Sequence, residues 1–163
     1  MKTMHMLAGM LLCINLLCSC NGNEVAAYVE KFPEISSDTI RFPDEIDTPA
    51  IKSPFDEKEL YPFGKFTLHE DTVITLACHH DIIEPYGQVM AEYIIDGKRV
   101  DQVMIAMGDM DGSARSFIDF PEIEVEEEVA GDERGGYTMF TTYLVTPEGF
   151  KQIDYHDTSP FSK

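Results

Sequence analysis

Residues 86–107 read YGQVMAEYIIDGKRVDQVMIAM, and this stretch decides the fold class. Its first half alternates apolar and polar side chains, which is typical of a β-strand with one buried face. Asp96-Gly97 comes next and favours a two-residue hairpin turn, because both central positions of a type I′ turn need positive φ. A second alternating run follows the turn. The stretch therefore predicts an antiparallel β-hairpin.

The hairpin also predicts which side chains face each other across the two strands. Counting outward from the turn places Tyr93 opposite Val100 and Val89 opposite Met104. With this register the apolar sets of both strands share one face. We expect that face to be buried.

Turn signals divide the chain after residue 65 into further short strands, with almost no helical periodicity. Residues 137–145 are apolar on both faces, which is typical of a central strand covered on both sides. Strands are expected over 72–79, 86–95, 98–107, 114–120, 123–129, 137–145 and 150–156. Seven to eight strands at this spacing predict a mainly β domain over 65–163, built as an antiparallel β-sandwich or barrel.

Residues 20–64 are expected to form an acidic, Pro-rich tether that packs in part on the domain. Five of the nine prolines lie between positions 33 and 62, and proline can neither donate to a β-ladder nor continue a helix. The short elements expected within this segment are a helix over 24–32, with Val25, Tyr28 and Phe32 on one side, and an edge strand over 37–42.

The charge balance excludes whole classes of partner. Twelve Lys and Arg stand against 30 Asp and Glu, a net charge of −18, whereas nucleic-acid binding needs clustered basic side chains. A hydrophobic content of 44% is too high for a disordered acidic tail. The sequence has neither a G-x-S-x-G elbow nor a Gly-rich phosphate loop. We therefore assign no catalytic residue and no cofactor.

The first 20 residues carry the features of an export signal. Lys2 precedes a short apolar run, and this order is typical of a secretory signal peptide. The run is shorter than the ~20 apolar residues that span a membrane. Leu17-Cys18-Ser19-Cys20 resembles the lipobox of bacterial lipoproteins, in which an apolar residue and two small residues precede the Cys that receives lipid.

This resemblance implies a signal peptide over 1–19 and a mature chain that begins with Cys20. Cys20 would carry acyl chains such as palmitate, and two or three chains hold a protein firmly on a membrane. The whole chain is similar to the small uncharacterised lipoproteins common in Bacteroidota. By the same resemblance, the single acid within residues 21–24 favours a lipid anchor that faces the periplasm of the bacterial cell envelope. The outer membrane is the expected location, and the inner membrane is the alternative.

Loss of the signal peptide changes the count of charges and cysteines. It removes Lys2 and no acid, which leaves 11 basic and 30 acidic residues, a net charge of −19. Cys13 and Cys18 leave as well, so Cys78 is the one remaining free cysteine and no internal disulfide is expected. Because Cys78 lies in an apolar run, we expect a buried, inert thiol.

His79 and His80 form the most metal-like motif in the chain. A zinc or copper site would want several imidazoles that converge, together with a carboxylate. In a β-strand, however, neighbouring side chains point to opposite faces. Only one of the pair could join a given site, and its partners would be His69 or His156 from elsewhere. The alternative is two ordinary histidines at the end of a strand.

Asp109 and Asp111 are the other candidate metal ligands. With Gly112 they resemble part of a calcium-binding loop, but the EF-hand spacing fails at both ends of the template. The alternative is an Asp/Gly turn between strands. The candidate metal ligands are therefore His79, His80, Asp109 and Asp111.

Three functions from different classes fit these observations. The favoured one is a lipid-anchored, non-enzymatic binding or accessory module of the cell envelope. The second is an acidic inhibitor or immunity-type protein that binds a basic protein partner, to which five glutamates within residues 122–128 could contribute. The third is a small metal-dependent hydrolase, which requires the histidines and acids to meet in one pocket.

Overall fold

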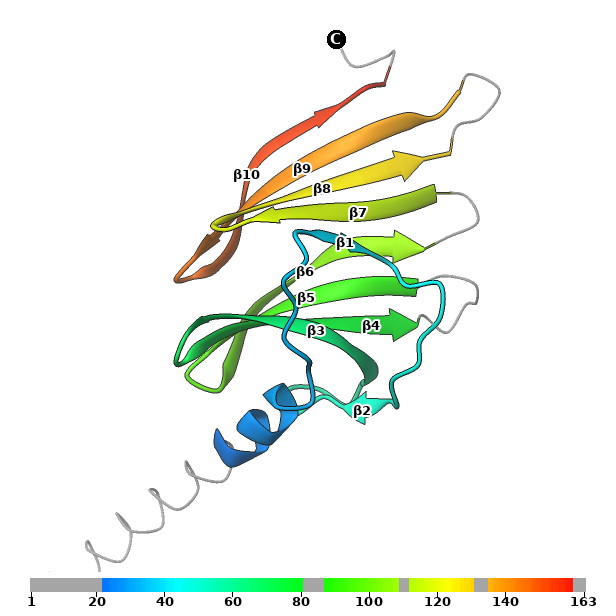
Figure 1. Ribbon diagram of the computed structural model, residues 1–163. Coiled ribbons are helices and arrows are strands. Elements are labelled where there is room, and N and C mark those ends of the chain that lie inside the picture. The colour runs from blue at the N-terminus through cyan, green and yellow to red at the C-terminus, as the bar shows by residue number, and fades with distance from the viewer. Residues whose placement is uncertain (1–21, 81–86, 109–111, 131–134, 160–163) are drawn as a thin grey trace, which may run out of the picture.

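A computed structural model describes residues 22–80, 87–108, 112–130 and 135–159. Strands make up most of this part, and a helix occupies residues 22–29 (Figure 1). The strands are β1 (Thr39–Arg41), β2 (Ile51–Lys52), β3 (Glu59–His69), β4 (Thr72–His80), β5 (Gly87–Ile95), β6 (Lys98–Gly108), β7 (Gly112–Asp119), β8 (Glu122–Val129), β9 (Tyr137–Thr146) and β10 (Gly149–Asp157).

All ten strands belong to one antiparallel sheet. Strands β2 to β10 lie side by side in chain order, and β1 pairs with β7 away from this path. β2 and β10 are the two edges, so the sheet that the structure describes is not closed. The prediction of a mainly β, antiparallel fold is confirmed. The strand number is ten rather than seven or eight, because the proline-rich segment also forms β2 and the start of β3.

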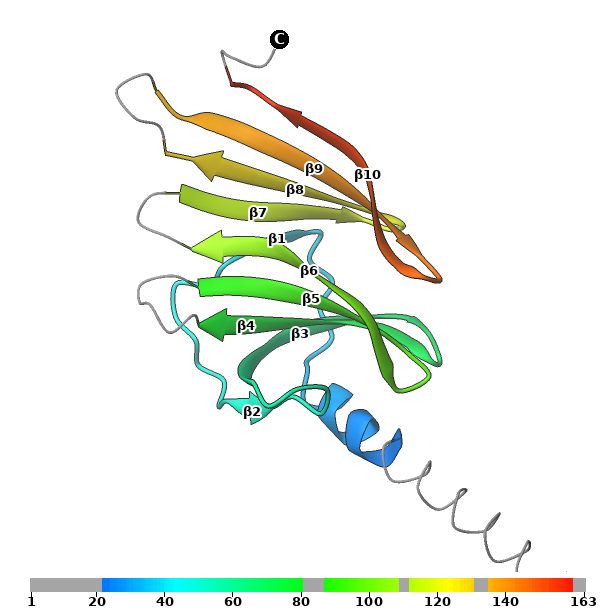
Figure 2. The same cartoon turned by 180° about the vertical axis from the view of Figure 1, so that it is seen from behind.

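The connections give the sheet two distinct ends, which both ribbon views show (Figures 1 and 2). Two-residue turns at 70–71, 96–97, 120–121 and 147–148 lie at one end, called here the turn end. β4, β6 and β8 finish at the opposite end, called here the loop end. The predicted hairpin turn is confirmed, since Asp96 and Gly97 have φ of 50° and 69°.

The predicted register of the β5–β6 hairpin is wrong beyond its first pairs. Tyr93 lies opposite Asp101, and Val89 lies opposite Ala106. Two irregularities cause the slip, one between Tyr93 and Ile94 and one between Val89 and Met90. Each leaves an extra residue on β6, as in a β-bulge, and shifts every later pair. The bulge next to Tyr93 leaves Val100 without a cross-strand partner and 42% exposed.

The sheet curls because β6 and β7 separate. They pair at only two positions, both at the loop end. Toward the turn end, β1 takes the freed edge of β7. The chain before β1 then reaches β3, where the amide of Ile35 donates to the carbonyl of Lys65 at 3.1 Å. Residues 33–50, called here the strap, therefore cross from β3 to β7 over the concave face and return to β2 (Figure 1).

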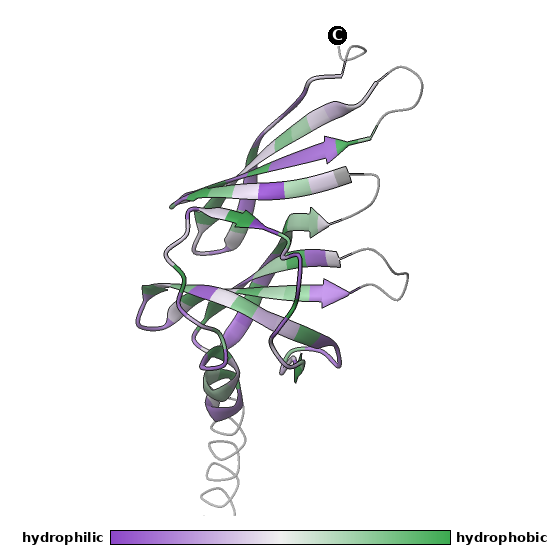
Figure 3. Ribbon diagram, turned by 45° about the vertical axis from the view of Figure 1, so that its right-hand side comes forward, coloured by the Kyte–Doolittle hydropathy of each residue, from purple (hydrophilic) through white to green (hydrophobic). Residues whose placement is uncertain are grey.

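The main hydrophobic core fills the concave face under the strap. Apolar residues alternate with polar ones along the strands, as the hydropathy colouring in Figure 3 shows. Two glycines make room for the strap: Gly87 and Gly108 face each other across β5 and β6, and the ring of Phe42 packs on both. The largest fully buried apolar side chains of this core are Ile40, Ile74, Leu76, Val89, Ile105 and Ile123.

Replacing Gly108 with alanine is expected to lower the free energy of unfolding by about 1–3 kcal/mol, as overpacking usually does. A Cβ atom there would lie 2.6 Å from Cδ1 of Phe42 and 3.1 Å from its Cγ. Urea denaturation measures the change. Gly22→Ala is the matched control, because a Cβ at Gly22 meets nothing within 4 Å. If the cost of Gly108→Ala persisted in full in a Phe42→Ala background, the ring would not be its cause.

A second, smaller core lies on the opposite face of the sheet, under the helix. Val25, Tyr28 and Phe32 are 5%, 3% and 2% exposed, so the side of the helix predicted to be apolar is the buried one. They pack on Leu60, Val73, Ala77 and Ile94. β4 is thus covered on both faces. The expectation of a doubly covered strand at 137–145 is wrong, because β9 is next to the edge and every residue in it is only partly buried.

A buried ion pair fastens the helix to the sheet. Glu92 on β5 is 0% exposed and accepts hydrogen bonds from the hydroxyls of Tyr28 and Thr75. Arg99 on β6 donates to Glu92 at 2.8 Å and to Asp56 at 2.9 Å. Buried charges need such partners, since an unpaired one costs several kcal/mol.

The pKa shifts of Arg99 and Tyr28 keep both side chains protonated, so both can donate to Glu92. Burial acts to lower the pKa of Arg99, but its hydrogen bonds to Glu92 and Asp56 outweigh burial and raise that pKa. Burial, reinforced by the charge of Glu92, raises the pKa of Tyr28 far above its ordinary value. Tyr28 therefore remains a hydrogen-bond donor to the carboxylate at any physiological pH.

Candidate functional site

The structure places the histidines of the predicted metal site apart. His80 lies on the concave face, with its ring 5.5 Å from that of Tyr61, whereas His79 lies on the helix side. His69 and His156 are both exposed, on β3 and β10. Across residues 22–80, 87–108, 112–130 and 135–159, no group of three or more His, Cys, Asp or Glu side chains could hold a metal ion.

Four other residues were singled out in the sequence, and one of them lies within the described part of the chain. Asp109, Asp111 and the lipidation residue Cys20 lie outside the described residues. Cys78 is free and 1% exposed, and burial raises the pKa of its thiol to about 12. A thiol with that pKa is neither a nucleophile nor a ready metal ligand near pH 7.

His79 is a polar side chain held in an unfavourable setting. Its Nε2 atom is buried and has no hydrogen-bond partner among the described residues. Burial lowers the pKa of His79 below its ordinary value of 6.5, and the cations Lys58 and Arg99 add to this, whereas the nearby Glu92 and Asp56 act to raise it. The folded protein therefore holds this imidazole neutral.

Replacing His79 with glutamine is expected to make stability less dependent on pH between 7.5 and 5. In the unmodified chain the unfolded state takes up a proton near pH 6.5, while the folded state binds it only at lower pH. Stability is therefore full above pH 6.5 and falls as pH drops through the lowered pKa. Urea denaturation at pH 7.5 and pH 5 measures both chains. Equal losses of stability in the two chains would contradict this reading of His79.

The glutamate run belongs to β8, where glutamates alternate with buried apolar residues. Ile123 and Val125 are buried in the core. The glutamates at 122, 124, 126 and 128 point to the opposite, outer face, as alternate residues of a strand do. Two of them have partners on β7: Glu126 pairs with Arg115, and Glu128 accepts from the hydroxyl of Ser113 at 3.3 Å.

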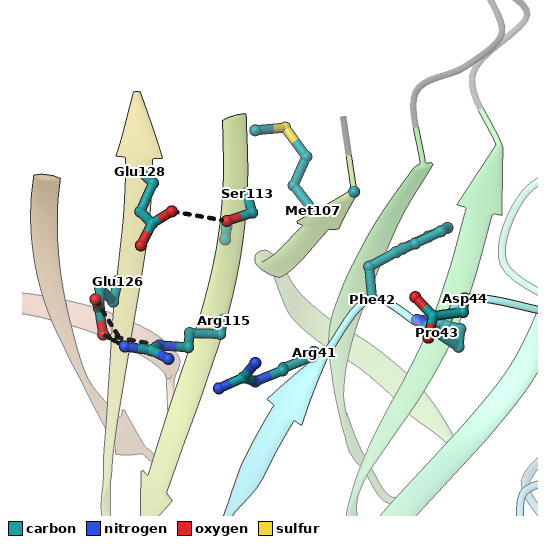
Figure 4. A pocket seen from close by; sticks show the side chains of 11 residues that line it. Arg41, Phe42, Pro43, Asp44, Met107, Ser113, Arg115, Glu126 and Glu128 are labelled. Atoms are coloured by element: carbon teal, nitrogen blue, oxygen red, sulfur yellow. Dashed lines mark hydrogen bonds and ion pairs between the residues drawn. The ribbon is translucent and has the colours of Figure 1, made fainter. Parts of the chain in front are cut away.

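An open pocket of about 450 Å³ lies beside these glutamates, at the loop end (Figure 4). Its floor is formed where β1 pairs with β7. Arg41 on β1 and Arg115 on β7 are cross-strand partners, so two guanidinium groups share one face. We call this the arginine pocket. It is lined mainly by Arg41, Phe42, Asp44, Ser113, Arg115 and Glu128.

Arg115 is fixed in place by its neighbours. Its Nε and Nη2 atoms donate to the two carboxylate oxygens of Glu126, each at 2.9 Å. This fork-to-fork geometry is the strongest arrangement available to a guanidinium and a carboxylate. The guanidinium carbon also lies 5.3 Å from the centre of the Phe117 ring. The charge of Arg115 is therefore already neutralised.

Arg41 is different, because its guanidinium has no partner. In the part of the chain that the structure describes, it forms neither a hydrogen bond nor an ion pair. In Figure 4 its tip lies next to Arg115 and away from Asp44. Like charges that face each other across two strands are unfavourable. The two remaining carboxylates of the lining, Asp44 and Glu128, flank the pocket at a distance from Arg41 (Figure 4).

The arrangement can bind an oxyanion. A free guanidinium offers a planar fork of N–H donors that matches a carboxylate or phosphate. The volume falls in the range of small-molecule sites. Sequence reasoning missed this pocket, since Arg41 and Arg115 are 74 positions apart and meet only through the β1–β7 pairing. The one available signal was the scarcity of basic residues, 12 in 163.

Comparisons with known proteins returned no match to a family model, to a curated protein or to a solved structure. Within the described residues, no helix has both the length and the apolar character needed to cross a membrane.

Proposed function

We propose that this protein is a lipid-anchored, non-enzymatic binding module of the bacterial cell envelope, and that the arginine pocket is its ligand site. The observation that carries the proposal is the unpartnered guanidinium of Arg41 beside Arg115, in a chain with 30 acidic residues. A bound oxyanion would supply the partner that Arg41 lacks, since Glu126 already neutralises the charge of Arg115.

The lining also defines the rest of the ligand. Asp44 and Glu128 leave carboxylate oxygens at the sides of the pocket, and these can accept hydrogen bonds from amines or hydroxyls. The ligand is therefore a small polar molecule, or the end of a chain, that carries a carboxylate or phosphate together with hydrogen-bond donors. Nucleic acid is not a candidate, because Arg41 is the one free cation among the described residues that line the pocket.

The anchor in this proposal is Cys20. Its support is the resemblance of residues 17–20 to a lipobox and the apolar run before it. The location proposed is the outer membrane, with the domain in the periplasm. A strongly acidic mature chain is not drawn electrostatically to anionic lipid surfaces, so the acyl chains are what hold it there.

A titration followed by NMR tests the pocket. Inorganic phosphate and glycylglycine are added to the ¹⁵N-labelled protein at constant ionic strength, with chloride as the reference. We expect saturable shifts at the amides of Ser113 and Arg115. Arg41→Ala is expected to weaken binding at least tenfold, whereas Lys52→Ala, which removes a cation from exposed β2, should leave it within twofold. Shifts that do not saturate, or that survive in Arg41→Ala, would refute the pocket as the site.

A basic protein partner is the second candidate, favoured by the row of glutamates on the outer face of β8. Glu122 and Glu124 in this row have no ion-pair partner among the described residues. Capture of a basic envelope protein at low salt, lost at high salt and in a Glu122→Gln, Glu124→Gln variant, would support this reading. Capture that is unchanged in that variant would oppose it.

A further inference from the structure

The chain after Cys20 enters the folded domain almost at once. Only Asn21 separates Cys20 from Gly22, the first helical residue described. Two residue steps span at most about 7 Å. A flexible tether of 20–64 would instead leave the domain free to tumble above the membrane. The position of the helix therefore decides how an anchored domain is oriented.

The helix is fixed on the domain by packing and by a buried charge. Tyr28 packs edge-to-face against Phe32 and Phe55, with ring centres 5.0 and 5.8 Å apart. Its hydroxyl donates to the fully buried Glu92. These contacts join the helix to β5 and to the loop before β3. The segment next to the anchor thus moves with the sheet.

The start of the helix lies at the turn end of the sheet. A Cβ built on Gly97, in the β5–β6 turn, would be 3.9 Å from the Cα of Gly22 and 4.0 Å from Val25. The β3–β4 turn is also close, since Asp71 and Gly22 line one hollow. Figures 1 and 2 show the same placement, with the helix below the sheet and its first residues on the side of the turn end.

The arginine pocket lies at the opposite end. β6 runs from Lys98 at the turn end to Gly108, which lines the pocket. Ten residue steps of an extended strand cover about 30 Å. Lipid at Cys20 and ligand in the pocket are therefore separated by nearly the whole length of the sheet.

We propose that the lipid bilayer lies against the turn end of the domain, around residues 70–71 and 96–98, and that the arginine pocket faces away from the membrane. This inference rests on the lipid anchor proposed above. We expect no electrostatic attraction to the bilayer at this contact. Among the described residues at 70–71 and 96–98, the acids Glu70, Asp71 and Asp96 outnumber the one free cation, Lys98. The pocket is left open to ligands in the compartment that the domain faces.

Short-range fluorescence quenching tests the orientation. Full-length Lys98→Cys and Ala130→Cys variants are lipidated by a bacterial host, labelled with a dye and placed in phosphatidylcholine vesicles with quenchers on the headgroups. Both positions are exposed, at the turn end and the loop end. Cys78 is buried and does not take up the label. We expect at least threefold stronger quenching at position 98 than at position 130.

A spacer provides the matched control. Twelve Gly and Ser residues inserted between Cys20 and Gly22 form a flexible linker of about 20 Å, which should bring the quenching at the two positions within 1.5-fold of each other. Equal quenching in the lipidated chain without the spacer would overturn the orientation and leave the anchor intact. A chain that acquires no lipid at Cys20 would overturn both.

Discussion

Replacing Arg99 with methionine is expected to lower the free energy of unfolding by about 3 kcal/mol. The substitution leaves the carboxylate of Glu92 fully buried without its cation, and breaking a buried pair in this way costs about 3–5 kcal/mol. We expect a loss at the lower end of this energy range, because the Arg99 side chain is 20% exposed and because Tyr28 still donates to Glu92. Urea denaturation at pH 7 measures the change.

Two further variants isolate the cause. Lys98→Met is the matched control, since Lys98 is the exposed neighbour and its replacement should change stability by less than about 0.5 kcal/mol. A Glu92→Gln, Arg99→Met double variant should be more stable than Arg99→Met alone, because no uncompensated charge remains. If Lys98→Met and Arg99→Met had equal effects, the ion pair under the helix would not be a stabilising contact.

Replacing Phe32 with alanine is expected to cost about 3–5 kcal/mol, the usual range for a buried phenylalanine. Phe32 is 2% exposed and closes the small core on which the helix rests. Its loss removes the edge-to-face contact with Tyr28 and weakens the hold on the whole segment next to Cys20. Urea denaturation gives the free energy, and limited proteolysis reports whether residues 22–32 become accessible.

Phe117→Ala serves as the control for that experiment. Phe117 is also a phenylalanine on an ordered element, but it is 37% exposed. Its removal should cost less than about 1 kcal/mol and leave residues 22–32 protected. A Phe32→Ala variant as stable as Phe117→Ala would mean that the helix does not pack on the sheet in solution.

The strands after residue 65 could be read from the sequence because their signals are local. Alternation identifies each strand, and a turn dipeptide such as Asp96-Gly97 joins it to the next. The same local pattern gave the buried side of the helix, with Val25, Tyr28 and Phe32. What local pattern could not give was the pairing after a bulge. Val100 shows this, because nothing in its neighbourhood distinguishes a bulged position from a paired one.

The arginine pocket and the packing of the proline-rich segment could not be read in this way. The prolines excluded a long helix in residues 33–62, but Pro62 lies inside the eleven-residue strand β3, and irregular backbone can still pack tightly. The fit of Phe42 on Gly87 and Gly108 depends on contacts 45 to 66 positions apart. Arg41 meets Arg115 through the same folding of the strap. The residues of such a site can be identified only once the topology of the fold is known.

The lipid at Cys20 underlies both the proposed anchor and the proposed orientation at the membrane, and mass spectrometry of the N-terminal peptide tests it most directly. The full chain is expressed in a lipoprotein-processing bacterium, extracted from the membrane fraction and digested. We predict an N-terminal peptide that begins at Cys20 and carries two or three acyl chains, and its absence in a Cys20→Ala variant. A membrane-extracted chain that retains residues 1–19, or that begins elsewhere with Cys20 unmodified, would contradict the account.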